Sequence, residues 1–364
     1  MVSIKKPIQM MIGPTAIPGR VLRAMNHISI SHRSKEYSVV HERVTTNLKK
    51  VFNTKNEVLV LTSSGTGAME AVILNCFSAG DEIVVPVIGK FSEQYAQMAE
   101  IYGLKVKRVM FEYGRTADVE IVMKEVTSST KGVFVVHNES STGIYNDIEA
   151  FGKALKDTNA LLVVDSVSGL GGLETRMDEW NIDAALTSSQ KALMSPAGLA
   201  FVALSEKAWS KVECSSFPKY YFDFKIARKF NEVHQTLTTP AVYTLFAVDE
   251  ALKMIFEEGL ENIYIRNKNN TKRLLEGIKE TGLNLLAKDE KFASPTLTAV
   301  HVPGKSKYFI SELAKRDVIV GGGMPPLTED VFRVGTMGYV SKNDVTVFLH
   351  ELKDVVKNLN LSLN

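Results

Sequence analysis

Short apolar runs alternate with amphipathic stretches from about residue 57 onward. The runs have the length and β-branched content of strands, and they lie at 57–62, 83–87, 105–111, 132–137, 160–165, 184–188 and 199–204. Stretches with helical spacing separate the first five, at 68–77, 91–102, 119–126 and 148–156. Because buried strands that alternate with helices form parallel sheets covered on both faces, we expect a mostly parallel sheet. No helix fits between 188 and 199, so an antiparallel strand is expected there.

The alternation stops after residue 209. Residues 210–240 are mixed and rich in aromatic side chains, and helical spacing returns over 240–258 and 260–281. The rest of the chain predicts a smaller α/β unit, with strands at 296–301, 318–320 and 331–336 and helices at 307–315 and 342–358. The pattern therefore indicates two α/β parts of unequal size.

Composition supports a globular chain and excludes several functional classes. Hydrophobic residues make up 45% and charged residues 23% of the 364 positions, and the formal net charge is +2. No basic block suggests nucleic-acid binding, and no apolar run approaches the roughly 20 residues of a membrane helix. With Cys76 and Cys214 alone, neither a disulfide framework nor a multi-cysteine metal site is expected. The segment Met1–Pro7 lacks a signal-peptide core, so we expect a cytoplasmic protein without metal, nucleic-acid or membrane partners.

Three strand ends carry unusual residues. Ser64-Gly65-Thr66-Gly67 lies between a strand and a helix, where small residues either bind an anion at the helix N-terminus or simply pack tightly. Asp165 ends an apolar strand and acts either as a ligand-facing carboxylate or as a helix cap. Lys191 precedes an uncharged stretch at 192–198 that would lower the pKa of its amine, although a solvated surface lysine is the simpler alternative.

These three features together predict a pyridoxal-phosphate site. The helix N-terminus would take the phosphate, and Asp165 would keep the pyridine nitrogen protonated. Lys191 would form the Schiff base and then transfer the proton of the substrate α-carbon. A nicotinamide-binding Rossmann enzyme is the competing interpretation, but Glu70 stands where the third glycine of that motif would fall.

Six motifs in order resemble the class V aminotransferases of fold type I, in particular the serine–pyruvate and alanine–glyoxylate group. They run from about residue 10 to the C-terminal part, as Gly13-Pro14-Thr15, Ser64-Gly65-Thr66-Gly67-Ala68-Met69-Glu70-Ala71, Glu139-Ser140-Ser141-Thr142-Gly143, Val164-Asp165-Ser166-Val167-Ser168, Ser189-Gln190-Lys191-Ala192-Leu193 and Phe332-Arg333-Val334-Gly335. The resemblance implies a large domain with a mostly parallel seven-stranded sheet between helices, and a smaller C-terminal α/β domain. We expect the N-terminal segment over 1–20, the large cofactor-binding domain over 21–255 and the small domain over 256–364.

The resemblance also implies roles for single residues around the cofactor. Phe91 matches the aromatic residue that stacks on the pyridine ring, and Val167 matches the residue on the opposite ring face; both could equally be core residues. Ser140 matches a hydroxyl near the cofactor's 3′ oxygen and the substrate, or forms a turn. Gln190 matches a phosphate-contacting residue, beside Ser64, Gly65 and Thr66.

The resemblance places further contacts outside this set. Thr238 matches a residue that reaches the phosphate of the neighbouring subunit, which implies a homodimer with active sites at its interface; capping the following helix is the alternative. Gln235 stands where animal members carry a tyrosine. Arg333 matches the arginine that binds the substrate α-carboxylate, a task that suits its planar fork, with a structural salt bridge as the alternative. His32-Arg33-Ser34 either binds a substrate phosphate or caps a helix.

The sequence therefore predicts an aminotransferase that moves the amino group of serine or alanine to pyruvate or glyoxylate. No second arginine for a side-chain carboxylate is evident, which favours small neutral substrates. Phosphoserine transamination is the alternative within the enzyme class, and a pyridoxal-phosphate-binding protein without transaminase activity is the alternative outside it. Cysteine desulfuration is disfavoured because neither cysteine lies on the loop where that chemistry needs one.

Overall fold

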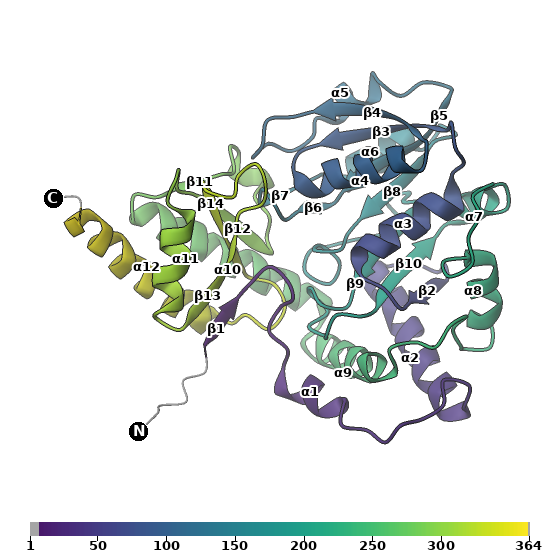
Figure 1. Cartoon of the computed structure of the whole chain (residues 1–364), viewed down its shortest axis with the longest axis horizontal. Helices are drawn as coiled ribbons and strands as arrows, with labels where there is room; N and C mark the ends of the chain where they lie inside the picture. The colour runs from purple at the N-terminus through teal and green to yellow at the C-terminus, as the bar shows by residue number, and fades with distance from the viewer. Residues whose placement is uncertain (1–6, 363–364) are drawn as a thin grey trace.

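The computed structural model describes residues 7–362, and a seven-stranded sheet forms the centre of the larger part (Figure 1). The strand order is β2-β10-β9-β8-β5-β3-β4. The strands are β2 (Val58–Leu61), β3 (Glu82–Val87), β4 (Lys105–Met110), β5 (Thr130–Val136), β8 (Leu161–Asp165), β9 (Ala184–Ser188) and β10 (Ala200–Leu204). β10 pairs antiparallel with both β9 and β2, and the other neighbours pair parallel. The mostly parallel sheet and its antiparallel strand are thus confirmed.

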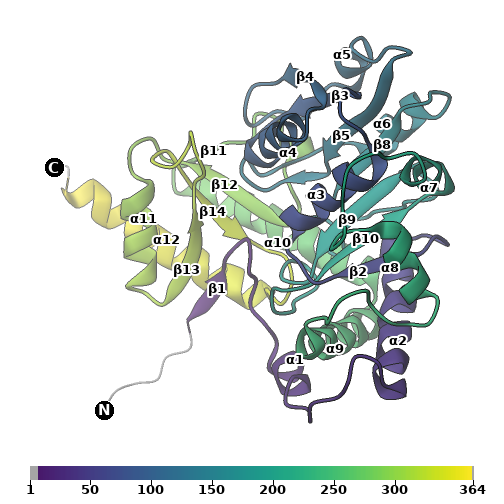
Figure 2. The same ribbon diagram turned by 45° about the vertical axis from the view of Figure 1, so that its right-hand side comes forward.

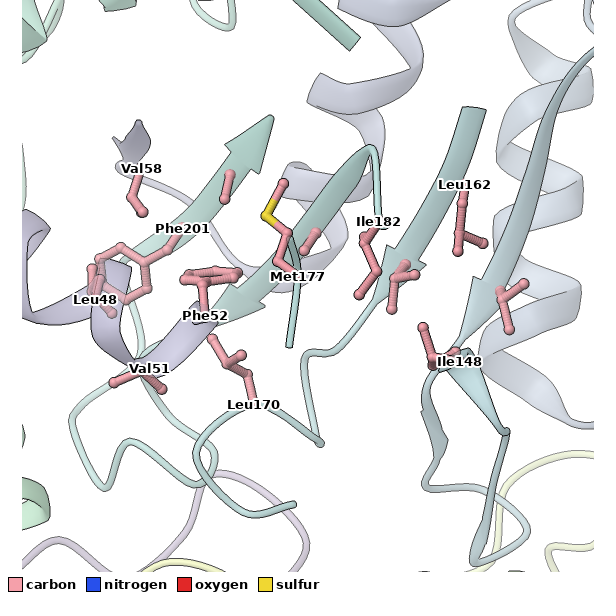
Figure 3. Packing of buried hydrophobic residues seen from close by; sticks show 14 of the residues in the cluster. Leu48, Val51, Phe52, Val58, Ile148, Leu162, Leu170, Met177, Ile182 and Phe201 are labelled. Atoms are coloured by element: carbon pink, nitrogen blue, oxygen red, sulfur yellow. The ribbon is translucent and has the colours of Figure 1, made fainter. Parts of the chain in front are cut away.

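Helices cover both faces of this sheet because successive strand residues point to opposite sides. Side chains of one face pack with α3 (Gly65–Cys76), α4 (Lys90–Ile101), α7 (Glu206–Val212) and α8 (Phe224–Asn231). Those of the other face pack with α2 (Lys35–Phe52), α5 (Val119–Met123), α6 (Ile148–Leu155) and α9 (Val242–Glu258). Figure 3 shows part of the second cluster, where Leu48 and Phe52 of α2 meet Phe201 of β10. The sheet is buried on both sides, as its continuous apolar strands predict.

A five-stranded sheet with order β1-β13-β14-β12-β11 forms the smaller part. Its strands are β1 (Ile8–Met10), β11 (Asn284–Leu285), β12 (Leu297–His301), β13 (Val318–Gly322) and β14 (Val331–Gly335), and they pack with α10 (Leu260–Glu280), α11 (Ser306–Ala314) and α12 (Lys342–Ser362). Figures 1 and 2 show β1 at the edge of this sheet, after which the chain crosses to α1 (Gly19–Ala24) beside α9. The expected N-terminal and C-terminal units include residues 1–6 and 363–364, which lie outside the described residues.

Some helices differ from the expectations. α5 ends at Met123 rather than at 126, and α8 lies within the stretch for which no helix was predicted. α8 is strongly amphipathic, but it spans only eight residues and buries Phe224 alone. No helix within residues 7–362 is long and apolar enough to cross a membrane.

Candidate active site

A cavity of about 160 Å³ lies where β5, β8 and β9 end. Carboxyl ends of parallel strands meet at one edge of a sheet, and ligands of open α/β folds bind there. Nine of the predicted site residues line it, namely Ser64, Gly65, Thr66, Phe91, Ser140, Asp165, Val167, Gln190 and Lys191. Met69, Val136, Asn138 and Ser168 complete the lining. Thr238 and Arg333 are the predicted residues that lie outside it.

The N-terminal segment covers Lys191. The Lys191 ammonium donates a hydrogen bond to the carbonyl of Ile12 at 3.2 Å. Thr15 fixes the same segment, because its hydroxyl donates to the Lys191 carbonyl at 2.8 Å and its N–H donates to the Gln190 carbonyl at 3.0 Å. Gly13 has a φ of 150°, and a Cβ there would lie 2.5 Å from the lysine Nζ. The Gly13-Pro14-Thr15 motif therefore lets the backbone approach the lysine closely.

Burial moves the pKa values of Asp165 and Lys191 towards neutrality. Desolvation raises the pKa of Asp165 to about 7, although the Val167 N–H donates to its Oδ1 at 2.8 Å and opposes the shift. Desolvation, together with the positive charge of Arg333, lowers the pKa of Lys191 to about 8. A lysine with such a pKa has a large fraction of neutral, nucleophilic amine near physiological pH.

The remaining lining fits a planar ring that carries a phosphate. The Ser64 side chain does not cap the first turn of α3, so backbone N–H groups of that turn are available to an anion. The Gln190 Oε1 atom is buried and has no hydrogen-bond partner among the described residues. Gly65 lets Val167 approach the helix, because a Cβ on Gly65 would lie 2.5 Å from a Val167 methyl carbon. These features match the groups that the sequence assigns to pyridoxal phosphate.

Glu139 organises the cavity wall, a role that the sequence reasoning missed. Its buried carboxylate accepts hydrogen bonds from the Ser92 N–H at 2.9 Å and the Phe91 N–H at 3.3 Å, at the N-terminus of α4. It also accepts from the Ser141 hydroxyl at 2.6 Å and the Ser141 N–H at 3.2 Å, in the turn that carries Ser140. One carboxylate therefore joins the segment of Phe91 to the segment of Ser140.

Replacing Glu139 with glutamine should destabilise this wall. The amide turns one acceptor into a donor that faces N–H groups, so we expect a loss of about 1–3 kcal/mol of unfolding free energy. The same substitution should lower the affinity for the cofactor about tenfold. Chemical denaturation and cofactor titration measure the two effects, and Glu93→Gln on α4, the helix whose N-terminus Glu139 contacts, is the control. Equal behaviour of the two variants would show that Glu139 does not position the site.

Asn138 is a second lining residue that the sequence reasoning missed. Its amide nitrogen donates to Ser168 at 2.9 Å and to Thr296 at 3.0 Å, whereas its Oδ1 atom is buried without a partner among the described residues. It lies two positions after the last residue of β5, Val136, so a polar residue after a buried parallel strand was an available signal. The amide oxygen is an acceptor close to Ser140 and Asp165 in the same cavity lining.

Arg333 approaches the site from the small sheet. Its guanidinium donates from Nε to the carbonyl of Gly322 at 2.7 Å and from Nη1 to the carbonyl of Ser140 at 2.9 Å. Burial lowers the pKa of this side chain to about 10, so it stays cationic at neutral pH. No salt bridge joins Arg333 to an acid among the described residues, which leaves its charge available to a carboxylate ligand.

Thr238 lies away from the cavity of its own chain. It lines a separate small depression with Tyr221 and Gln235, and its carbonyl accepts a hydrogen bond from the Thr236 hydroxyl at 2.8 Å. The helix-cap alternative is wrong, because α9 begins at Val242 and its N-cap residue is Ala241.

The segment that contains Arg33 is held by this same loop. Arg33 donates to the Gln235 side chain at 3.0 Å and to the Thr236 carbonyl at 2.8 Å, and it stacks on Phe230. Ser34 caps α2 by accepting from the Tyr37 N–H at 3.3 Å, which confirms the capping interpretation for that residue. No group of three or more His, Cys, Asp or Glu side chains arranged to bind a metal occurs within residues 7–362.

Fold and cavity together define a pyridoxal-phosphate enzyme of fold type I. The family model described as aminotransferase class V matches residues 12–348, and the chain belongs to that family. Class V aminotransferases use pyridoxal phosphate, and the resemblance that the motifs indicate is confirmed.

Three known proteins illustrate the similarity. The chain is 37% identical to the small subunit of a soluble hydrogenase from Synechococcus, over 97% of this chain and 94% of that protein. It is 34% identical to serine–glyoxylate aminotransferase of Methylorubrum extorquens, over 90% of this chain and 85% of that one. The crystal structure of alanine–glyoxylate aminotransferase from Nostoc superposes with a TM-score of 0.91 at 28% identity, over 98% and 97% of the two chains.

The lowered pKa of Lys191 predicts how cofactor capture depends on pH. The rate at which the apoenzyme takes up pyridoxal phosphate should rise with pH and level off above about pH 8, since the neutral amine is then the major form. For a lysine with the usual pKa of 10.5, the rate would keep rising with pH until above pH 10.5. Stopped-flow absorbance from pH 6.5 to 9.5 measures the profile.

Two variants complete this test. Arg333→Met removes a positive charge that lowers the lysine pKa, so its profile should move to higher pH. Arg316→Met, which removes a guanidinium that pairs with Glu312 and Glu351 outside the cavity, should leave the profile unchanged. A wild-type profile that still rises at pH 9.5 would contradict the assignment.

Proposed function

We propose that this aminotransferase moves the amino group of a small neutral amino acid, serine or alanine, to glyoxylate or pyruvate. The observation that supports the proposal is that the guanidinium of Arg333 lies beside a small cavity. Arg333 provides one site for an α-carboxylate, and none of the residues that line the cavity is an arginine or a histidine. A substrate with a second carboxylate or a phosphate would therefore lack a partner within this part of the described chain.

Each residue of the site has its own role in the proposed reaction. The bound cofactor supplies an electron-poor ring that accepts the electrons of the substrate's Cα–H bond. Asp165 would hold a proton on the ring nitrogen through its buried carboxylate, which lines the cavity. Lys191, once its amine is free, takes the Cα proton and returns it. Arg333 would orient the substrate carboxylate, and the Ile12 carbonyl would accept a hydrogen bond from the lysine amine while that amine is free.

The assignment of phosphate contacts follows the same logic. The N-terminus of α3, with Ser64, Gly65 and Thr66, would hold the phosphate together with Gln190. Phe91 and Val167 would enclose the ring from its two faces, and Ser140 would meet the 3′ oxygen and the substrate.

Phosphoserine is a poorer substrate for this site. The candidate phosphate-binding pair is His32-Arg33, and the Arg33 guanidinium already donates to Gln235, Thr236 and Leu237. Burial and the neighbouring Arg33 charge also lower the pKa of His32, so its imidazole carries little positive charge at neutral pH.

We further propose a homodimer in which Thr238 contacts the phosphate bound by the partner chain. Thr238 lies outside its own cavity, which supports a contact across an interface. Large apolar side chains are exposed on the elements around it, namely Ile28, Tyr220, Tyr221, Val233 and Tyr243. Sedimentation should give about twice the 40.2 kDa of one chain.

Cys76 and Cys214 are free thiols, which supports a reducing, cytoplasmic location.

A half-reaction screen tests the substrate choice. We expect serine and alanine to convert the bound cofactor to its amine form, seen as loss of visible absorbance, far faster than aspartate or phosphoserine. Arg333→Lys should raise KM for the favoured donor about 10²-fold with a smaller change in kcat, because a bidentate charge-assisted contact is lost. Rapid conversion by phosphoserine alone, or an unchanged KM in Arg333→Lys, would overturn the proposal.

A further inference from the structure

A second and larger cavity, of about 720 Å³, lies outside the site described above. It is bounded by residues of β7 (Ile144–Tyr145), α6, α10 and the short helix η1 (Glu290–Phe292). Its apolar surface comes from Leu173, Trp180, Tyr264, Leu275 and Pro295. Neither the family match nor the transamination chemistry accounts for a cavity at this position.

The two cavities lie on opposite sides of the same strand end. Val136 and Asn138 line the cofactor cavity, whereas His137 between them lines the second one. The His137 N–H donates to the Asp165 carbonyl at 2.8 Å, which fixes the strand ends side by side. His137 is only 2% exposed, and its ring meets Trp180 edge to face at 6.2 Å. A nearly buried imidazole therefore forms part of the lining.

Hydrogen bonding defines what His137 presents to the second cavity. Its Nδ1 atom lies 3.1 Å from the Ser166 hydroxyl, and that hydroxyl has no other partner among the described residues. The hydroxyl hydrogen is satisfied only if it points to Nδ1, so the ring proton lies on Nε2. Burial lowers the pKa of His137 to about 3, which keeps the ring neutral. Nε2 makes no hydrogen bond within residues 7–362, so it is an unused donor.

The charges of the lining favour an anion. Four carboxylates and three lysines line the cavity. Three of the carboxylates pair with cations outside the lining, namely Glu149 with Lys153 at 2.6 Å, Glu174 with Arg176 at 2.6 Å and Glu290 with Lys279 at 2.9 Å. The fourth, Asp147, keeps its charge and accepts a hydrogen bond from the Ala150 N–H at 3.0 Å. Lys268, by contrast, makes no ion pair within the described part of the chain. It follows Tyr264 by one helical turn of α10, and Lys272 follows it by another, so all three share one helix face.

We propose that this second cavity binds a small organic anion with a flat apolar body, such as an aromatic carboxylate. The anionic group would lie by Lys268, the apolar body would pack against Trp180 and Leu173, and the Nε2 donor of His137 would bond a ligand oxygen. The volume admits such a molecule without displacement of the lining.

Tryptophan fluorescence provides a local test. The chain has two tryptophans, so in the Trp209→Phe background the emission comes from Trp180 alone. We titrate the holoenzyme with 4-nitrobenzoate, which quenches tryptophan on contact, and with the neutral analogue 4-nitrobenzyl alcohol. The expected result is saturable quenching by the carboxylate, with much weaker quenching by the alcohol.

Variants separate this site from the catalytic cavity. Lys268→Met should weaken the carboxylate about fivefold, as expected for loss of one partly exposed charge, and Lys268→Arg should retain binding. Lys342→Met, an exposed lysine on α12, is the matched control and should have no effect. Arg333→Lys should leave the quenching unchanged. Equal affinity for the alcohol, or equal behaviour of Lys268→Met and Lys342→Met, would overturn the proposal.

Discussion

Replacing Lys191 with alanine should lower kcat for transamination by at least about 10⁴-fold, because one side chain is both the nucleophile for the cofactor and the base for the Cα proton. The mutated site keeps Asp165 and the helix N-terminus, so the cofactor should still bind, although more weakly. Steady-state rates with alanine and glyoxylate, together with the absorbance of the bound cofactor, measure both effects.

Controls distinguish lost chemistry from lost structure. Lys219→Ala, a partly buried lysine whose amine donates to the carbonyl of Phe217 outside the cavity, should retain full activity. Lys191→Ala should fold normally, because it removes an amine whose charged form is already disfavoured by burial. Retained turnover in Lys191→Ala would refute the mechanism.

Replacing Asp165 with asparagine should lower kcat by about 10²- to 10³-fold, since the ring nitrogen loses the negative charge that keeps it protonated. Asparagine is isosteric and keeps an acceptor for the Val167 N–H, which contacts Asp165 Oδ1 at 2.8 Å. The loss would therefore reflect charge rather than geometry. Rapid-quench measurement of each half-reaction shows whether proton removal slows.

Cofactor binding should also change the protonation state of Asp165. In the site without cofactor, burial raises the pKa of this carboxyl to about 7, so it holds a proton about half of the time at neutral pH. A cationic ring nitrogen nearby favours the ionised carboxylate and lowers that pKa. Binding of cofactor whose ring nitrogen is already protonated should thus release protons from Asp165 below pH 7, which a pH-indicator assay measures. Wild-type kcat in Asp165→Asn would contradict the assigned role.

Part of the cavity could be predicted from strand ends, because the carboxyl ends of parallel strands lie at one edge of a sheet. The family resemblance alone predicted Phe91, Ser140, Val167 and Gln190. Asp165 and Lys191 end or follow buried strands, and Ser64 precedes a helix that follows one, so local signals placed all three at one edge. The same reasoning applied to β5 would have found Asn138. Glu139 has no such signal, since it joins the nearby Ser141 to backbone N–H groups of residues about 48 positions earlier.

Other features depended on contacts that a linear pattern does not contain. α2 is the exception, because its buried residues Tyr37, Val44, Leu48 and Val51 stand at helical spacing and the pattern alone could have predicted it. The position of Thr238 outside its own cavity follows from the course of the loop before α9. The second cavity arises where α10 faces α6, two helices more than 100 residues apart in the chain.

The path of the N-terminal segment has a consequence for how the enzyme binds and releases substrates. β1 pairs with β13 of the small sheet, and within a few residues the same segment reaches the lysine amine through Ile12. β14 of that sheet carries Arg333, which also bonds the Ser140 carbonyl. A shift of the small sheet would therefore move the carboxylate contact and the lysine contact together, so that substrate capture and liberation of the amine form one coordinated displacement.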